Sequence, residues 1–74
     1  MKKANIINDF LIYAIEEYRF WEKKNGRETI KLFSDYGVFD YIAGNYGALH
    51  TLGGKYITQD INLFIEKRKK TNLR

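Results

Sequence analysis

The side chains that could carry out chemistry in this sequence are one serine, one histidine and several carboxylates, with no cysteine. A hydrolase needs a nucleophile beside a base, but Ser34 lies in Phe-Ser-Asp-Tyr-Gly and not in the G-x-S-x-G turn that exposes such a serine. Without cysteine there is no thiolate or disulfide, and a single histidine cannot fill the four-ligand shell of a structural zinc site. We therefore expect no catalytic residues, no metal and no cofactor.

Two other patterns imitate enzyme motifs only in part. Asp35 and Asp40 could act as a general acid and base, but a solvated position at the junction of two helices explains both carboxylates. Gly54-Lys55 resembles the end of a phosphate-binding loop, yet Tyr56 stands where that loop needs serine or threonine. We predict that the chain is not an enzyme.

The net charge of +4 is concentrated at the C-terminal end, where residues 66–74 hold five of the 13 basic residues and one of the nine acidic residues. Phosphate neutralisation needs only a dense cluster of cations, so Lys67, Arg68, Lys69 and Lys70 are the candidate nucleic-acid-binding residues. Cations are also favoured at the C-terminal end of any helix, and we prefer this interpretation. A helix-turn-helix over residues 28–46 is disfavoured, because its second helix would carry Asp40 and no lysine or arginine.

The elements that position these residues follow from hydrophobic spacing and from caps, in a chain without proline. Apolar residues recur every three or four positions, which predicts an all-α fold, a compact bundle of about four helices. Gly26 should end the first helix in a left-handed conformation, Gly37 should end the second, and Thr58 should cap the last. The predicted helices are 4–24, 28–36, 38–46 and one that begins after Thr58, with an ordered glycine-containing loop over 47–57 and an extended piece at 55–57.

We divide the chain into a single helical domain, residues 1–68, and a basic C-terminal tail, residues 69–74. The residues predicted to form the core are Ile7, Leu11, Ala14, Ile15, Phe33, Ile42, Leu49, Ile61, Phe64 and Ile65. Aromatic residues make up 16 % of the chain. A single small core does not readily enclose so much aromatic surface, so part of it should face a partner.

We take Tyr46, His50, Thr51 and Tyr56 as the candidate protein-binding residues. His50 has two other interpretations. A histidine in a loop usually holds the backbone through its ring nitrogens, and we favour such a structural role over action as an acid or base beside a carboxylate.

The most specific pattern is Asn-Tyr-x-x-Leu-His-Thr-x-Gly-x-x-Tyr-Ile-x-x-Asp-Ile, which begins at Asn45 and ends at Ile61. It resembles a family of short bacterial proteins catalogued as domain of unknown function thirty-seven ninety-one, and a looser similarity extends from about Phe10 to Arg68. The resemblance implies a small helical protein without enzymatic annotation, encoded near toxin genes that include ADP-ribosyltransferase-like ones. It thereby implies an antitoxin-like or accessory role.

Together these patterns predict a non-enzymatic protein-binding module whose partner is another protein, such as a neighbouring toxin, or a second copy in a homo-oligomer. Nucleic-acid binding through the basic cluster is the alternative. Asn5, Asn8 and Asp9 interrupt the apolar run that a signal peptide needs, and no run reaches the roughly 20 residues of a membrane span. We expect a cytoplasmic protein that makes no membrane contact.

Overall fold

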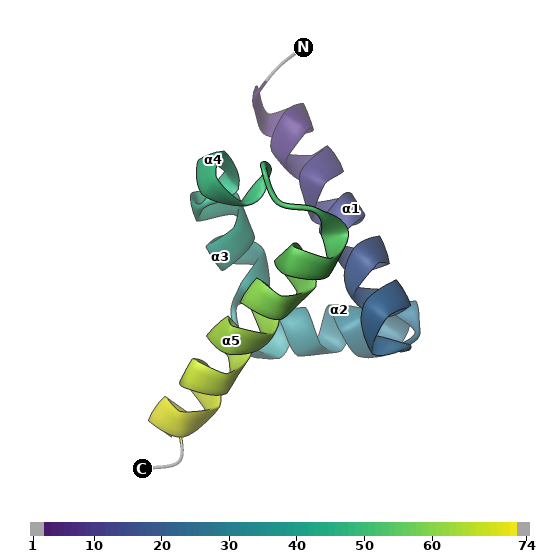
Figure 1. Cartoon of the computed structure of the whole chain (residues 1–74). Helices are drawn as coiled ribbons and strands as arrows, with labels where there is room; N and C mark the ends of the chain where they lie inside the picture. The colour runs from purple at the N-terminus through teal and green to yellow at the C-terminus, as the bar shows by residue number, and fades with distance from the viewer. Residues whose placement is uncertain (1–2, 73–74) are drawn as a thin grey trace.

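The computed structural model describes residues 3–72, which form five α-helices and, within that range, no strand. The helices are α1 (Lys3–Glu22), α2 (Gly26–Asp35), α3 (Val38–Gly44), α4 (Tyr46–Leu49) and α5 (Gly54–Asn72). The two long helices, α1 and α5, pack against each other, and α2 lies across the C-terminal end of α1 (Figure 1). The all-α bundle predicted from the spacing of apolar residues is confirmed.

The turn between α1 and α2 is closed by other residues than those predicted. Lys23 takes the left-handed conformation with a φ of 56°, whereas Gly26 is the first residue of α2, so the prediction that Gly26 ends α1 is wrong. Asn25 begins α2 with a capping box. Its side-chain oxygen accepts a hydrogen bond from the backbone N–H of Glu28 at 2.8 Å, and the Glu28 carboxylate accepts one from the backbone N–H of Asn25 at 3.0 Å. Because this pair commits Asn25 to α2, α1 must end earlier.

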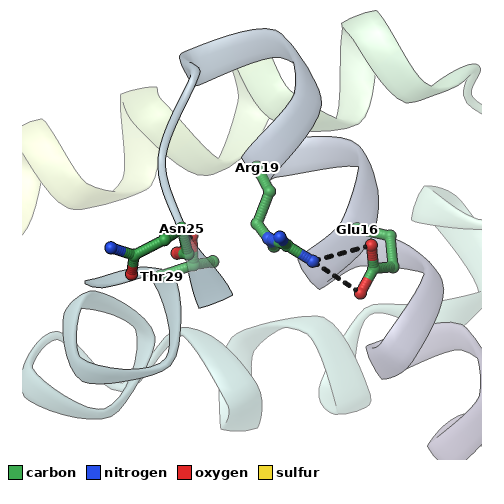
Figure 2. Close-up of polar contacts among 4 residues, drawn as sticks. All are labelled: Glu16, Arg19, Asn25 and Thr29. Atoms are coloured by element: carbon green, nitrogen blue, oxygen red, sulfur yellow. Dashed lines mark hydrogen bonds and ion pairs between the residues drawn. The ribbon is translucent and has the colours of Figure 1, made fainter. Parts of the chain in front are cut away.

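Polar side chains on both sides of this turn make local hydrogen bonds. Arg19 donates from Nη1 to both carboxylate oxygens of Glu16, at 3.0 and 3.1 Å (Figure 2). Its guanidinium also lies against Gly26, where an added Cβ would be 3.9 Å from Nε. On α2 the buried Thr29 donates its hydroxyl to the Asn25 carbonyl at 2.9 Å. The two sets of hydrogen bonds thus lie within α1 and at the start of α2, and the contact of Arg19 with Gly26 joins the two helices.

Gly37 separates α2 from α3 as predicted, with a φ of 69° that an L side chain rarely adopts. The position is also crowded by α5, because a Cβ on Gly37 would lie 3.1 Å from Nη2 of Arg68. The turn thus needs glycine for its backbone, whereas the exposed end of Arg68 would have to shift only slightly to admit a Cβ.

The segment between α3 and α5 is more helical than predicted. Residues 46–49 form α4, and α5 begins at Gly54, so the extended piece at 55–57 and the cap at Thr58 are both wrong. The Ile57 amide donates to the Gly53 carbonyl at 2.9 Å, which places residues 54–57 in the first turn of α5. Ile57 is fully buried and continues the inward face of Ile61 and Ile65, a spacing that extends the helix backwards from the predicted start.

The core is built mainly where α1, α2, α3 and α5 meet. Six of the predicted core residues are buried, whereas Ile7, Leu11, Ile15 and Phe64 are only partly covered. Sequence reasoning missed other buried side chains, among them Phe10, Tyr18, Thr29, Val38, Ile57 and Thr58. Phe10 and Tyr18 thus add two aromatic rings to a core for which the prediction named only aliphatic residues of α1.

Candidate protein-binding surface

Tyr46 and His50 lie one turn apart at α4 and are in contact. Their rings stack with centroids 4.7 Å apart and planes 9° apart, and His50 Nδ1 lies 2.9 Å from the Tyr46 carbonyl oxygen. The Tyr46 ring also meets the edge of the Phe10 ring on α1, at a centroid distance of 5.2 Å. Tyr46 is thus half-buried and holds α4 against α1, while the exposed His50 covers its outer face.

Thr51 and Tyr56 flank the turn that leads from α4 into α5. The exposed Thr51 donates its hydroxyl to the Ala48 carbonyl at 3.0 Å, which closes the end of α4. Tyr56 lies in the first turn of α5 with 61 % of its surface exposed. The structure therefore brings Tyr46, His50 and Thr51 together at α4, and it presents Tyr56 separately on α5.

A second cluster, which sequence reasoning did not assign, joins α3 to α5. The Tyr41 hydroxyl donates to Asp60 Oδ2 at 2.6 Å, and the Tyr41 ring stacks on the Phe64 ring with centroids 4.1 Å apart. Burial first, then the hydrogen bond to Asp60 and its negative charge, raise the pKa of Tyr41 to about 12. The Arg68 guanidinium lies 5.0 Å from the centre of the Phe64 ring, on which it can form a cation–π contact.

This cluster could have been found from the family pattern. Asp60 belongs to the quoted string, and Tyr41 and Phe64 lie close to its ends in sequence. Asn45, the first residue of the string, donates its side-chain amide to the Tyr41 carbonyl at 2.8 Å. The polar residues of the string therefore bond largely within the chain, and its apolar residues Leu49, Ile57 and Ile61 are buried.

The two carboxylates that resembled an acid and base are both exposed, and one of them is paired with a lysine. Asp35 is exposed at the end of α2 and pairs with Lys31 Nζ at 3.2 Å, while Asp40 is exposed in the first turn of α3. Within residues 3–72 no three histidine, cysteine or acidic side chains are placed to hold a metal ion. In the same range no helix is long and apolar enough to cross a membrane.

A groove of about 350 Å³ lies beside α1, α2 and α5 and contains polar side chains of both charges, Glu22, Lys24, Glu66 and Lys69. At its edge the Tyr18 hydroxyl donates to Asn62 Oδ1 at 2.6 Å. Burial, and then the negative charge of Glu22, raise the pKa of Tyr18 to about 12, so this hydroxyl stays protonated near neutral pH. The hydrogen bond ties the middle of α1 to α5.

The basic cluster lies on the last turns of α5, which continues through Lys69 and Lys70 to Asn72, so this part of the predicted tail is helical. All four cations are exposed. Two of them turn toward aromatic rings of the same chain, Arg68 over Phe64 and Lys69 at 5.9 Å from the Tyr36 ring centre. Residues 73–74 of that tail lie outside the described part of the chain.

With the exception of Ile30 on α2, which is 49 % exposed, the large exposed apolar side chains in the described part of the chain lie on the two long helices, and the sequence interpretation gave most of them no role. On α1 these are Phe20 (70 % exposed), Ile12 (60 %), Trp21 (44 %), Tyr13 (40 %) and Ile6 (37 %). On α5 they are Leu63 (63 %) and Tyr56 (61 %). Ile6, Tyr13 and Phe20 recur every seven residues, and so do Tyr56 and Leu63. A seven-residue repeat keeps side chains on one face of a helix, and this spacing was the available signal.

Comparison with known proteins gives one match. The profile of a family described as Protein of unknown function (DUF3791) matches residues 9–68, in agreement with the resemblance seen in the motif. Searches of the curated proteins and of the solved structures return no match.

Proposed function

The chain belongs to this family, and from that premise we propose that it is a non-enzymatic protein-binding module. The observation that carries the proposal is the exposure of large apolar side chains, above all Phe20 at 70 %, Leu63 at 63 % and Tyr56 at 61 %. Isolated exposed apolar residues are ordinary, but apolar residues that line one face of a helix are typical of interaction surfaces.

The polar residues of the family pattern support the proposal indirectly. Asp60 accepts a hydrogen bond from the Tyr41 hydroxyl at 2.6 Å. Thr51 donates to the Ala48 carbonyl at the end of α4, and the His50 ring stacks on the Tyr46 ring. The bond between Tyr41 and Asp60 holds α3 on α5, and the other two contacts hold α4 and the turn that follows it. A partner is therefore expected to contact the exposed aromatic and aliphatic side chains that this frame presents, with Tyr56 as an anchor.

The family resemblance suggests one class of partner, a toxin protein that this chain neutralises or assists, and we include an antitoxin-like role in the proposal. A homo-oligomer is the other form of protein partner. In both cases the removal of exposed apolar surface from water would drive binding.

The test is capture of a partner on the immobilised chain from an extract of the source cells. We expect Tyr56→Ala to weaken capture by tenfold or more, because an aromatic anchor in an interface typically contributes about 2 kcal/mol or more. Ile30→Ala, at an exposed position on α2, is the matched control and should retain the partner. Capture that is equal for the wild type and Tyr56→Ala would contradict the proposal.

Tyr46→Ala is a poorer test, since Tyr46 packs on Phe10 and His50 and its removal disturbs α4.

The alternative function, nucleic-acid binding, rests on the four exposed cations of α5. A double variant with Lys67→Gln and Lys70→Gln leaves the two ring contacts of Arg68 and Lys69 in place. If phosphate contacts drive binding, the slope of log affinity against log salt should fall by about 2 in this variant.

A further inference from the structure

Two exposed apolar stripes of equal repeat lie on the long helices, and the ring contacts of Tyr13 and Phe20 are with their neighbours on α1 itself. The α1 stripe consists of Ile6, Tyr13 and Phe20, and the α5 stripe consists of Tyr56 and Leu63. Seven residues of α-helix rise about 10.5 Å, so the apolar side chains of both stripes are spaced equally along their helices. Because α1 and α5 pack together through their inward faces, the two stripes point away from the core and cannot cover each other in one molecule.

The two helices also carry opposite charge. α1 contains four acidic and two basic residues, and α5 contains five basic and two acidic residues. Asp9 and Glu16, themselves seven residues apart, lie next to the α1 stripe, and Lys67 and Lys70 follow the α5 stripe; all four are exposed. Two copies of α1 would bring like charges together, whereas α1 against α5 brings opposite charges together.

We propose that the α1 stripe of one molecule binds the α5 stripe of a second copy, so that the chain associates with itself head to tail. The proposal rests on the proposed protein-binding function and names the partner of these two faces. When Tyr13 is set against Leu63, Tyr56 meets Ile6 if the helices run in the same direction and Phe20 if they run in opposite directions. The apolar contact is thus preserved in both orientations.

A contact between different faces leaves one α1 stripe and one α5 stripe open at the two ends, so chains grow as concentration rises. A single pair of helices forms an interface below the standard size, so we expect weak association, with a Kd of about 0.1 to 1 mM. The wild-type chain should therefore show an apparent mass of 8.8 kDa when dilute and should pass twice that mass when concentrated.

The test uses two substitutions at the most exposed positions of the stripes, Phe20→Lys on α1 and Leu63→Glu on α5. Each places a like charge against the opposing helix, so each variant alone should stay monomeric in sedimentation equilibrium at concentrations where the wild type associates. An equal mixture should form a complex of two chains and grow no further, because the Leu63→Glu chain keeps its α1 stripe and the Phe20→Lys chain keeps its α5 stripe. Ile12→Glu, which is 60 % exposed and lies off the α1 stripe, is the control and should associate like the wild type.

Three results would overturn the proposal: a wild type that stays monomeric at about 1 mM, association of Leu63→Glu alone, and a mixture that remains monomeric. Association of Leu63→Glu alone would indicate that like faces pair. The circular dichroism of each variant establishes that it is folded. These results do not affect whether a different protein is captured through Tyr56. Failure of self-association can therefore be distinguished from failure of the proposed function.

Discussion

Replacing Tyr41 with phenylalanine tests whether the hydrogen bond between Tyr41 and Asp60 holds α3 on α5. Phenylalanine keeps the ring that stacks on Phe64 at 4.1 Å and removes only the hydroxyl that donates to Asp60 at 2.6 Å. A hydrogen bond to a charged group contributes about 1.5–3 kcal/mol, and Asp60 is only half-buried, so water can replace part of the loss. We therefore expect the free energy of unfolding to fall by about 1–2 kcal/mol.

Thermal unfolding at pH 7, followed by circular dichroism at 222 nm, measures this change. A domain of this size loses about 4–8 °C in Tm for each kcal/mol, so Tyr41→Phe should melt about 4–16 °C below the wild type. Tyr56→Phe, at a site that is 61 % exposed, is the matched control and should melt with the wild type. A double-mutant cycle with Asp60→Ala should return most of the loss as coupling energy. A Tyr41→Phe variant that melts with the control would show that this hydrogen bond does not hold α3 on α5.

Three further changes probe the core, a helix start and the response to pH. Ile61→Ala, at a fully buried site, should lower the free energy of unfolding by about 2–5 kcal/mol in urea denaturation, and Phe64→Ala, only partly buried, should cost less; the reverse order would contradict the burial described above. Gly54→Ala should melt at a lower temperature than Gly44→Ala, because a Cβ on Gly54 would overlap the Glu17 side chain, whereas a Cβ on Gly44 would have nothing within 4 Å. Equal melting temperatures would show that Glu17 moves aside freely. The pKa of Tyr18 is about 12 in the fold and near 10 in the unfolded chain, so its contribution to stability is complete below pH 10 and is lost as pH rises toward 12; urea midpoints from pH 9 to 12 should therefore fall less steeply for Tyr18→Phe.

The parts of the fold that could be predicted are those set by local spacing. Ile61 and Ile65 recur at helical intervals and are buried, and the positive φ of Gly37 follows from the conformational freedom of glycine. The end of α1 was missed because two local signals competed for Asn25-Gly26. The capping box with Glu28 took these residues for α2, and Lys23 accepted the left-handed backbone instead.

The start of α5 was missed for a tertiary reason. Two consecutive glycines before Lys55 favour a loop on local grounds, but burial of Ile57 against the core extends the helix back to Gly54. The bond between Tyr41 and Asp60 spans 19 residues and depends on how α3 packs on α5, which the spacing of apolar residues does not encode. The exposed stripe of Ile6, Tyr13 and Phe20 was visible in its seven-residue repeat, but the wider inward face of α1 obscured it.

The central claim is that exposed apolar side chains, and not the basic end of α5, bind the partner. The most direct measurement is the affinity of the captured partner for the wild type, for Tyr56→Ala and for the double variant Lys67→Gln and Lys70→Gln, each at low and high salt. We expect Tyr56→Ala to weaken binding by tenfold or more at both salt concentrations, and we expect the double variant to stay within about threefold of the wild type. Binding that is unchanged in Tyr56→Ala, falls steeply with salt and is lost in the double variant would contradict it.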